Sequence, residues 1–194
     1  MPKKKPIYYQ PWFIILVVVI FIGVWIMGTY NGFITMTQKI DSQWAQVETQ
    51  YQRRYDLIPN LVSSVTGFMQ FEKDLLTEVT ALRSQWSNAA TTADKIEAST
   101  GLEGALSRLL VVMENYPDIK SDQTVLGLMD ELAGTENRVA VERSRYNELV
   151  RQYNTGIKIF PSNILANMFG FIEKPYFESV EGSEEVPKVD LTVG

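Results

Sequence analysis

Apolar residues fill the first part of the chain without interruption and then recur periodically. The stretch "WFIILVVVIFIGVWIM" (residues 12–27) is apolar apart from one glycine, and no charged residue occurs between Lys5 and Lys39. About 20 helical residues cross the hydrocarbon core of a bilayer. A buried helix of a soluble protein would keep a polar stripe, which this stretch lacks. We therefore predict a transmembrane helix over residues 7–30.

A cleaved signal peptide is the main alternative for this segment, because the basic start "MPKKK" precedes the apolar run. Cleavage needs small residues after the run, whereas Ile26 and Met27 occupy those positions. Three lysines (residues 3–5) precede the span, and only Lys39 follows closely. This asymmetry predicts a cytoplasmic N-terminus (residues 1–6) and a periplasmic or extracellular position for the rest of the chain.

Beyond the span, apolar residues recur at helical steps of three, four or seven. The membrane helix is therefore expected to continue into the following domain. Four stripes are visible: Phe33, Ile40, Trp44, Val47, Tyr51, Tyr55 and Ile58; Leu61, Val65, Phe68, Leu75 or Leu76, Val79, Leu82 and Trp86; Ile96, Leu102, Leu106, Leu109, Met113 and Tyr116; and Val125, Met129, Leu132, Glu136, Val139, Arg143, Tyr146, Val150, Tyr153 and Ile157.

Prolines and capping residues divide these stripes into separate helices. Pro59, Pro117 and Pro161 each interrupt a stripe, because proline lacks a backbone donor and clashes with the preceding turn. A loop is expected between Trp86 and Lys95, where Thr91 and Asp94 resemble a capping box. After the other two prolines, Ser121 or Asp122 is expected to cap the fourth helix, and Ser162 to begin a short final helix.

These features predict an all-α fold, since no segment alternates like a strand. The N-terminal transmembrane helix is expected to be continuous with an antiparallel bundle of long helices (residues 31–160). A short C-terminal amphipathic helix and loop (residues 161–177) follow. The remaining residues, 178–194, are acidic and poor in aromatics, so they are expected to be either mobile or docked on a neighbour.

Composition narrows the functional classes. The net charge is -5, and the basic residues form no aromatic-laced patch, which argues against nucleic acid as a partner. Cysteine and histidine are both absent, so thiol catalysis and disulfides are excluded, and the commonest zinc ligands and the usual general base are missing. No cofactor, metal or catalytic residue is assigned, and the chain is predicted not to be an enzyme.

Charged residues nevertheless occupy positions on the apolar stripes. Glu136 and Arg143 fall on the fourth stripe, Glu72 falls on the second, and Arg83 lies at that stripe's edge. We interpret these four residues as a structural polar network that fixes helix register. Two alternatives are a pair of catalytic carboxylates, as in glycosidases, and a carboxylate metal site. The first lacks an accompanying cleft loop, and the second has arginines between its carboxylates.

Four motifs occur in order along the chain: "YDLIPNLV" (residues 55–62), "ENYPDIKS" (114–121), "GTENRVAVERSRYNELVRQYN" (134–154) and "FPSNILANMFGF" (160–171). Together they resemble the LemA family of bacterial membrane proteins. The resemblance covers nearly the whole chain except the acidic tail. It implies one N-terminal membrane helix in the bacterial inner membrane and a bundle of long helices, without an established enzymatic activity. Some members are tied to shaping membrane compartments, and others are encoded near membrane metalloproteases.

The expected function is therefore structural. A thin bundle has a large side surface, and its aromatic residues exceed what a narrow interior needs. We expect the chain to contact itself and the lipid bilayer, forming a homo-oligomeric scaffold that organises or shapes the membrane. The alternative is an adaptor or accessory protein for a membrane protease or envelope stress system. Candidate oligomer contacts are Trp44, Trp86, Tyr116, Phe169 and Phe171.

Overall fold

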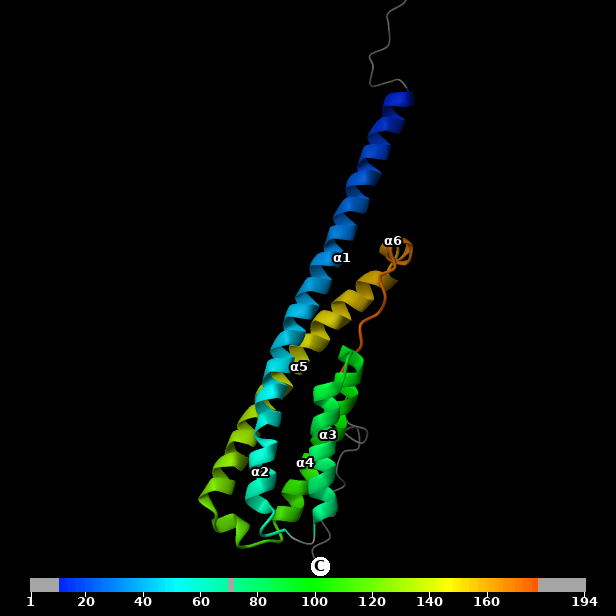
Figure 1. The fold of residues 1–194 in the computed structure, drawn as a ribbon. Coiled ribbons are helices and arrows are strands. Elements are labelled where there is room, and N and C mark those ends of the chain that lie inside the picture. The colour runs from blue at the N-terminus through cyan, green and yellow to red at the C-terminus, as the bar shows by residue number, and fades with distance from the viewer. Residues whose placement is uncertain (1–10, 70–71, 178–194) are drawn as a thin grey trace, which may run out of the picture. The chain divides into compact units, whose positions relative to one another are not determined.

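The computed structural model describes residues 11–69 and 72–177 (Figure 1). Its elements are α1 (Pro11–Asp56), α2 (Ile58–Val65), α3 (Lys73–Asn88), α4 (Thr92–Met113), a 3-10 turn η2 (Ile119–Ser121), α5 (Gln123–Lys158) and α6 (Ser162–Phe169). The described residues contain no strand, so the predicted all-α class is confirmed. The acidic tail lies outside the described residues.

Helix α1 runs without a break from the apolar segment to Asp56, over 46 residues. This confirms that the apolar helix continues into the following domain. The predicted interruption at Pro59 is confirmed as well, because Leu57 separates α1 from α2 and the proline lies in the first turn of α2. A proline in the first turn costs no helical hydrogen bond, since the first N–H groups of a helix have no intrahelical partner.

The other helix ends are set by local capping. Asp94 N donates to Thr91 Oγ1 at 3.1 Å, and Thr91 N donates to Asp94 Oδ2 at 3.2 Å. These reciprocal bonds form the predicted capping box at the start of α4. Asp122 caps α5, because its Oδ1 accepts from the backbone N of Thr124 at 2.8 Å and of Val125 at 3.1 Å. Helix α6 begins at Ser162, directly after Pro161, as predicted.

The second stripe is not one helix. Helix α2 ends at Val65 and α3 begins at Lys73, although the apolar spacing runs through this region. Phe68, expected on the stripe, is 39% exposed, and Met69 is fully buried instead. The prediction of a continuous second helix was therefore wrong, because the turn between the two helices shifts the buried position by one residue.

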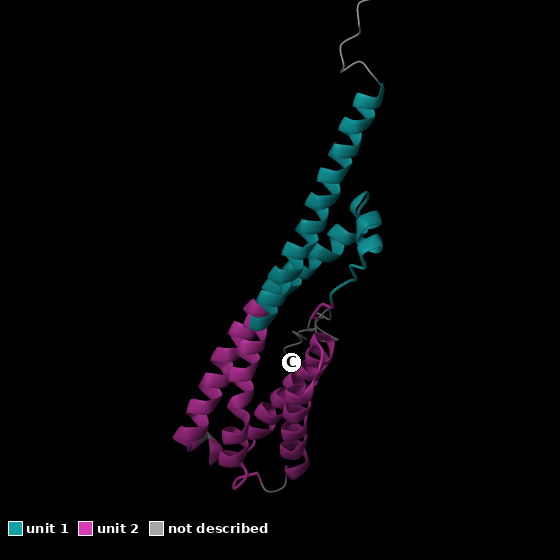
Figure 2. Cartoon of the chain, turned by 45° about the horizontal axis from the view of Figure 1, so that its top comes forward, with its two compact units in different colours: residues 1–45, 145–174 teal, residues 46–144, 175–194 magenta. Residues whose placement is uncertain are grey.

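The chain divides into two compact units (Figure 2). In unit 1 (residues 1–45 and 145–174), the first part of α1 packs against the last part of α5. The ring pairs Phe33–Tyr153 and Trp44–Tyr146 lie 6.4 and 5.6 Å apart, so the two segments run antiparallel. Unit 2 (residues 46–144 and 175–194) contains the end of α1, helices α2 to α4 and the first part of α5. There, α3 packs mainly against α4.

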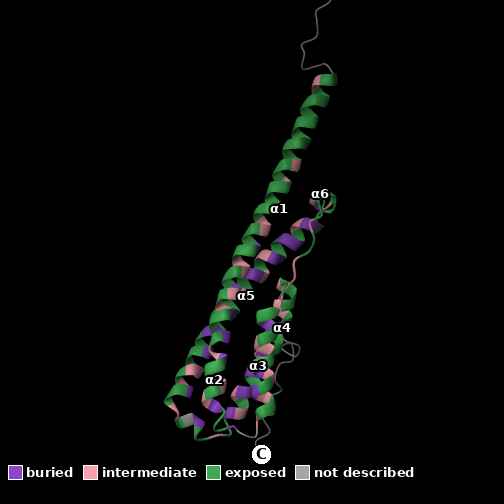
Figure 3. Cartoon of the chain, in the orientation of Figure 1, coloured by how far each residue is buried: buried purple, intermediate pink, exposed green. Residues whose placement is uncertain are grey.

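The core of unit 2 is aromatic where α1 meets α3. Tyr51 and Tyr55 are fully buried, and Trp86 of α3 lies 5.0 Å from the ring of Tyr55. Buried aliphatic residues from α2, α4 and α5 complete this core, namely Ile58, Leu61, Leu102, Leu106, Leu109 and Val139. Figure 3 shows the contrast between these buried faces and the largely exposed first turns of α1.

Candidate functional site

The first part of α1 is an uncovered apolar surface. Its most apolar stretch of 18 residues contains no buried residue, and Phe21, Val24 and Met27 are each at least 65% exposed. Such exposure is unfavourable in water but suits a lipid environment, in which every backbone group of a helix is already paired. This is the one candidate membrane span among the described residues.

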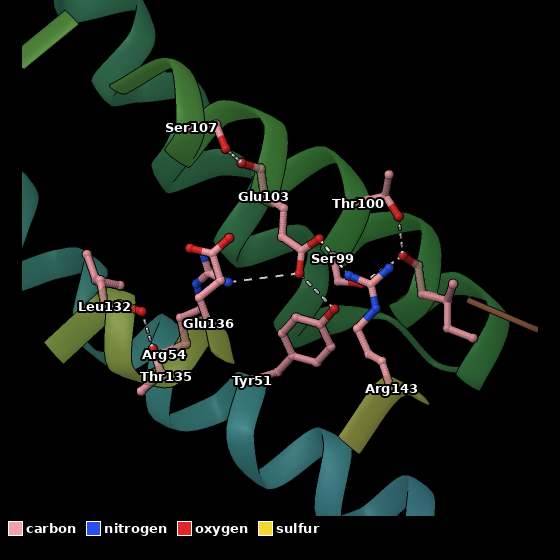
Figure 4. Close-up of polar contacts among 11 residues, drawn as sticks. Tyr51, Arg54, Ser99, Thr100, Glu103, Ser107, Leu132, Thr135, Glu136 and Arg143 are labelled. Atoms are coloured by element: carbon pink, nitrogen blue, oxygen red, sulfur yellow. Dashed lines mark hydrogen bonds and ion pairs between the residues drawn. The ribbon is translucent and has the colours of Figure 1, made fainter. Parts of the chain in front are cut away.

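A network of charged residues lies inside unit 2, centred on Glu103 of α4 (Figure 4). Its Oε2 accepts a hydrogen bond from Arg143 Nη1 of α5 at 2.9 Å, and its Oε1 accepts from the Tyr51 hydroxyl of α1 at 3.0 Å. Arg54 Nη1 lies 4.0 Å from the same Oε1. One carboxylate therefore joins α1, α4 and α5.

The network is largely shielded from solvent. The side chains of Arg54 and Glu103 are 5% and 18% exposed, and the buried Nε of Arg54 has no hydrogen-bond partner. Phe177 covers one side of the network, because the Arg143 guanidinium stands 4.7 Å from its ring centroid. A charge in such a place is tolerated only with an opposite charge beside it, so Glu103 holds both arginines in place.

Two buried tyrosines border the network. Burial raises the pKa of Tyr51 far above its ordinary value, and the nearby negative charge of Glu103 raises it further. Burial also raises the pKa of Tyr55, whose hydroxyl has no hydrogen-bond partner. Both hydroxyls are therefore neutral at physiological pH. A neutral Tyr51 is a hydrogen-bond donor to Glu103, which is a structural role rather than that of a general base.

Glu136 and Arg143, the two charged residues predicted on the fourth stripe, differ in their burial. Arg143 lies in the network, but Glu136 points outward with its side chain 62% exposed. The buried position on this turn of α5 is Thr135, so placing Glu136 on the core-facing stripe was wrong. Glu136 still reaches the network from its edge, with Oε2 3.6 Å from Arg54 Nη2. Glu136 and Arg143 thus contact different partners.

The two residues predicted from the second stripe lie apart from this network. Arg83 Nε donates to the backbone oxygen of Tyr55 at 3.0 Å, and its Nη2 lies 3.7 Å from Asp56 Oδ1. It therefore ties α3 to the end of α1. Glu72 directly precedes α3 and lines a surface groove. Arg54 and Glu103, which carry the network, were missed by the sequence analysis.

The candidate oligomer contacts are mostly used inside the chain. Trp86 is 2% exposed and packs between Tyr51 and Lys95, so it is a core residue and unavailable to a second copy. Trp44 packs edge-on against Tyr146. Tyr116 is half-buried in the turn after α4. Phe169 retains 46% exposure, whereas Phe171 is half-buried.

An aromatic cluster in unit 1 surrounds the end of the apolar part of α1. Tyr30 lies 5.0 Å from Phe169 and 5.8 Å from Phe171, and Phe171 also lies 5.0 Å from Phe33. Gly170 ends α6 and places Phe171 in this cluster. Its φ of 74° allows the backbone bonds from Gly170 N to Asn167 O and from Phe171 N to Ala166 O that close the helix.

Asn154 fixes the chain that leaves this cluster. Its buried side chain donates from Nδ2 to the backbone oxygen of Lys174 at 2.9 Å and accepts from the backbone N of Lys174 at 2.9 Å. The Asn154 amide thus pairs with both the backbone N–H and the backbone C=O of Lys174, as a residue of an adjacent strand would. The sequence analysis missed this residue, because nothing in a helical stripe distinguishes an asparagine that binds a distant backbone.

A surface groove of about 560 Å³ lies between α3 and α4. Leu75, Val111 and Val112 supply its apolar lining, and Val111 is 64% exposed. Charged residues also line it: Glu72, Asp74, Glu78 and Arg108, with the last two paired to each other. An exposed apolar groove flanked by charges is suited to contact with another protein.

The carboxylates of the described residues do not gather as a metal site would require. Within residues 11–69 and 72–177, no group of three or more histidine, cysteine, aspartate or glutamate residues is placed to share an ion. Glu103, at the centre of the charge network, contacts two arginines and a tyrosine. These contacts join helices of unit 2 to one another.

The fold and these sites define an all-α protein. Its apolar N-terminal helix continues into a helical unit in which ion pairs of Glu103 connect three helices. The sequence pattern of the LemA family matches residues 43–191. The chain belongs to the LemA family. The match extends into the acidic tail, which the four motifs had left out, and it begins after the apolar segment.

Individual relatives agree with this assignment. Magnetosome protein MamQ 2 of Paramagnetospirillum magneticum is 28% identical over 190 residues, covering 84% of this chain and 70% of the relative. Magnetosome protein MamQ of Magnetospirillum gryphiswaldense is 27% identical over 174 residues, covering 76% and 64%. Protein LemA of Metamycoplasma hominis is 23% identical over 194 residues, covering 97% and 87%.

Proposed function

We propose that this chain is a non-enzymatic, single-pass membrane protein whose helical domain self-associates into a scaffold on the membrane. The observation that carries the proposal is the uncovered apolar part of α1, which is continuous with a helix that packs into a folded unit. Lipid is the environment that covers such a surface. The kinship with proteins named magnetosome proteins supports a role that is organised on a larger scale than one chain.

Self-association needs an exposed contact surface, and the groove between α3 and α4 supplies one. Val111 is the most exposed of its apolar lining residues, and the charges beside it, Glu78 and Arg108, are of opposite sign. A second copy could present the same combination of apolar and charged groups. Chains attached to one membrane meet at high effective concentration, so weak contacts add up to a stable array.

The experiment places a photo-cross-linking amino acid at Val111 in the full-length chain within its native membranes. Because Val111 is exposed, the substitution is expected to leave the fold intact. The scaffold predicts cross-linked products at multiples of the mass of this chain. A matched control places the same group at Arg138, which is exposed on α5 and outside the groove. Equal yields from both positions would contradict a specific contact through the groove.

An adaptor for another membrane protein is the second candidate, and the same groove favours it. Its apolar lining and acidic residues would accept a segment of a different chain. In this case, the cross-linked products from Val111 would contain a second, unrelated protein, and the purified chain would remain small in detergent at every concentration. Mass spectrometry of the cross-linked band therefore separates the two functions.

We also propose that the N-terminus is cytoplasmic and that the domain after α1 lies on the opposite face of the bacterial inner membrane. The support is the excess of lysine before the span. A reporter enzyme that is active only in the cytoplasm, fused to the C-terminus, is expected to be inactive. Strong activity of that fusion would reverse the orientation without affecting the scaffold.

A further inference from the structure

Residues 159–172 form a second uncovered apolar surface, far from α1 in the sequence. This segment contains α6 and its two flanks, and it has no charged residue. Only Leu165 and Ala166 of α6 are buried. Six apolar side chains of the segment are exposed by between 46% and 79%: Ile159, Phe160, Ile164, Met168, Phe169 and Ile172. A surface of this kind is expected to be covered in the working protein.

The segment lies beside the end of the predicted membrane span. Phe169 and Phe171 both pack on Tyr30 of α1, and all three residues belong to unit 1. Tyr30 follows Trp12 by 18 residues, which corresponds to about 27 Å of helix and thus roughly to the thickness of a hydrocarbon core. Tyrosine and tryptophan prefer the two membrane–water interfaces. Helix α6 is therefore held at the level of one interface.

Charges in unit 1 respect the same boundary. All charged residues in the described part of this unit lie outside residues 11–38 and 159–172. Lys158 and Glu173 stand at either end of the second segment, and they pair with each other at 2.7 Å. Lys174 lies 3.6 Å from Asp41, one of the first charged residues of α1 after the span. The first charged residues after the span therefore lie close to the charged residues at both ends of the segment 159–172.

We propose that residues 159–172 insert into the interface of the same bilayer that α1 crosses, with Ile164 and Met168 reaching the upper acyl chains. Continuity with the uncovered surface of α1 selects lipid as the occupant. A helix lying in this position buries its apolar face by about 5 to 10 Å. Because the segment carries no charge, insertion is driven by apolar burial and is equal in neutral and anionic membranes. This inference rests on membrane insertion of α1 but not on self-association.

The test measures the depth of single labelled positions in the full-length protein. The chain has no native cysteine, so one introduced cysteine carries an environment-sensitive fluorophore without interference. Ile164→Cys and Met168→Cys probe the segment. Because both side chains are exposed, these variants are expected to fold normally. Two exposed positions of α1 serve as depth references: Ile22→Cys inside the apolar part and Gln38→Cys beyond it.

Each variant is placed in phosphatidylcholine nanodiscs that hold one chain. Bromine atoms on the lipid acyl chains quench labels within the bilayer, and iodide quenches labels in water. The expected result is bromine quenching at Ile22, Ile164 and Met168, with iodide quenching only at Gln38. The result is expected to be unchanged when phosphatidylglycerol is added to the nanodiscs.

Three outcomes would overturn the inference. If Ile22 is quenched by bromine while Ile164 and Met168 respond only to iodide, α1 spans the bilayer and the second segment lies in water. If Ile22 itself responds to iodide, the span fails, and this inference fails with it. If the labels on α6 become shielded only when several chains share a disc, a second copy covers the segment.

A second variant provides an independent check. The double change Ile164→Glu and Met168→Glu adds two charges to an exposed face without removing a buried side chain. A label at Ile172→Cys is expected to lose its bromine quenching and gain iodide quenching in this background. The matched control, Val111→Glu, lies outside the segment and is expected to leave the Ile172 label unchanged.

Discussion

The two units of this protein differ in the contacts that join their long helices: aromatic rings in unit 1 and charged side chains in unit 2. Unit 1 joins α1 to α5 through the rings of Phe33 and Tyr153, and to α6 through those of Tyr30 and Phe169. Unit 2 joins α1, α4 and α5 through a shielded carboxylate, Glu103, between two arginines. The described ring contacts of unit 1 are aromatic, whereas a shielded cluster of charges joins three helices of unit 2. The two units are therefore expected to respond differently to the loss of a charge.

The largest expected effect is that of Glu103→Gln. The change keeps the shape of the side chain but leaves the shielded Arg54 and Arg143 without their common counter-charge. A loss of about 3 to 5 kcal/mol in the free energy of unfolding is expected. Chemical denaturation of the full-length protein in detergent, followed by near-ultraviolet circular dichroism, measures it.

Glu136→Gln is the matched control, because its side chain is 62% exposed although it also faces Arg54. A solvent-screened pair contributes at most about 1 kcal/mol. If the two variants lose equal and small amounts of stability, the charges of unit 2 do not hold its helices together.

Alkaline pH is expected to have the next largest effect. Burial raises the pKa of Tyr146 in unit 1 from 10.0 to about 12, and it raises those of Tyr51 and Tyr55 in unit 2 further. The unfolded chain releases these protons first, so stability is complete below pH 10 and falls as the pH rises toward 12 and beyond.

Tyr146→Phe should make this fall less steep, which denaturation at a series of pH values would reveal. The ultraviolet absorbance of tyrosinate gives the order of ionisation, in which Tyr51 and Tyr55 follow Tyr146. Ionisation of all tyrosines of the folded protein at their ordinary pKa would contradict the burial described for both units.

Removal of the side-chain amide of Asn154 has a smaller expected effect, confined to unit 1. The variant Asn154→Ala loses both hydrogen bonds to the backbone of Lys174. Leaving these partly shielded groups unpaired is expected to cost about 1 to 2 kcal/mol. Hydrogen exchange of the amides of residues 171–174 should accelerate. Thr155→Ala, at an exposed neighbouring position, should leave the exchange unchanged.

The last comparison makes the same substitution, Gly→Ala, in both units, and the two expected effects are small and opposite in sign. Gly170→Ala puts a side chain at a φ of 74° and is expected to destabilise α6 by about 1 to 2 kcal/mol. Gly134→Ala lies inside α5, where an added Cβ meets nothing within 4 Å, and is expected to stabilise by up to about 1 kcal/mol. Thermal unfolding of both variants measures the difference, and a loss of stability from both would contradict the geometry at Gly134.

Local features of the fold could be predicted from the sequence, because each depends on a few adjacent residues. The capping box of Thr91 and Asp94 and the breaks at Pro59 and Pro161 are such cases. The continuity of α1 follows from an unbroken helical spacing. These predictions need no knowledge of which helices meet.

The charge network could be predicted only in part, because its members meet across helices. Arg143 stood out on its stripe, but its partner Glu103 lies 40 residues earlier on α4, where no local pattern marks it. Glu136 was mistaken for a core position because steps of three and of four are both helical, and only packing decides between Thr135 and Glu136. The role of the four predicted residues in setting register stays a prediction.

The most direct test of the central claim is electron microscopy of the full-length protein reconstituted into lipid vesicles. A scaffold anchored by α1 is expected to appear as repeating rings, cages or sheets on the membrane, which disperse when Val111→Glu disrupts the groove. Small, separate particles at every protein density, in membranes where α1 is inserted, would contradict self-association as the function of this chain.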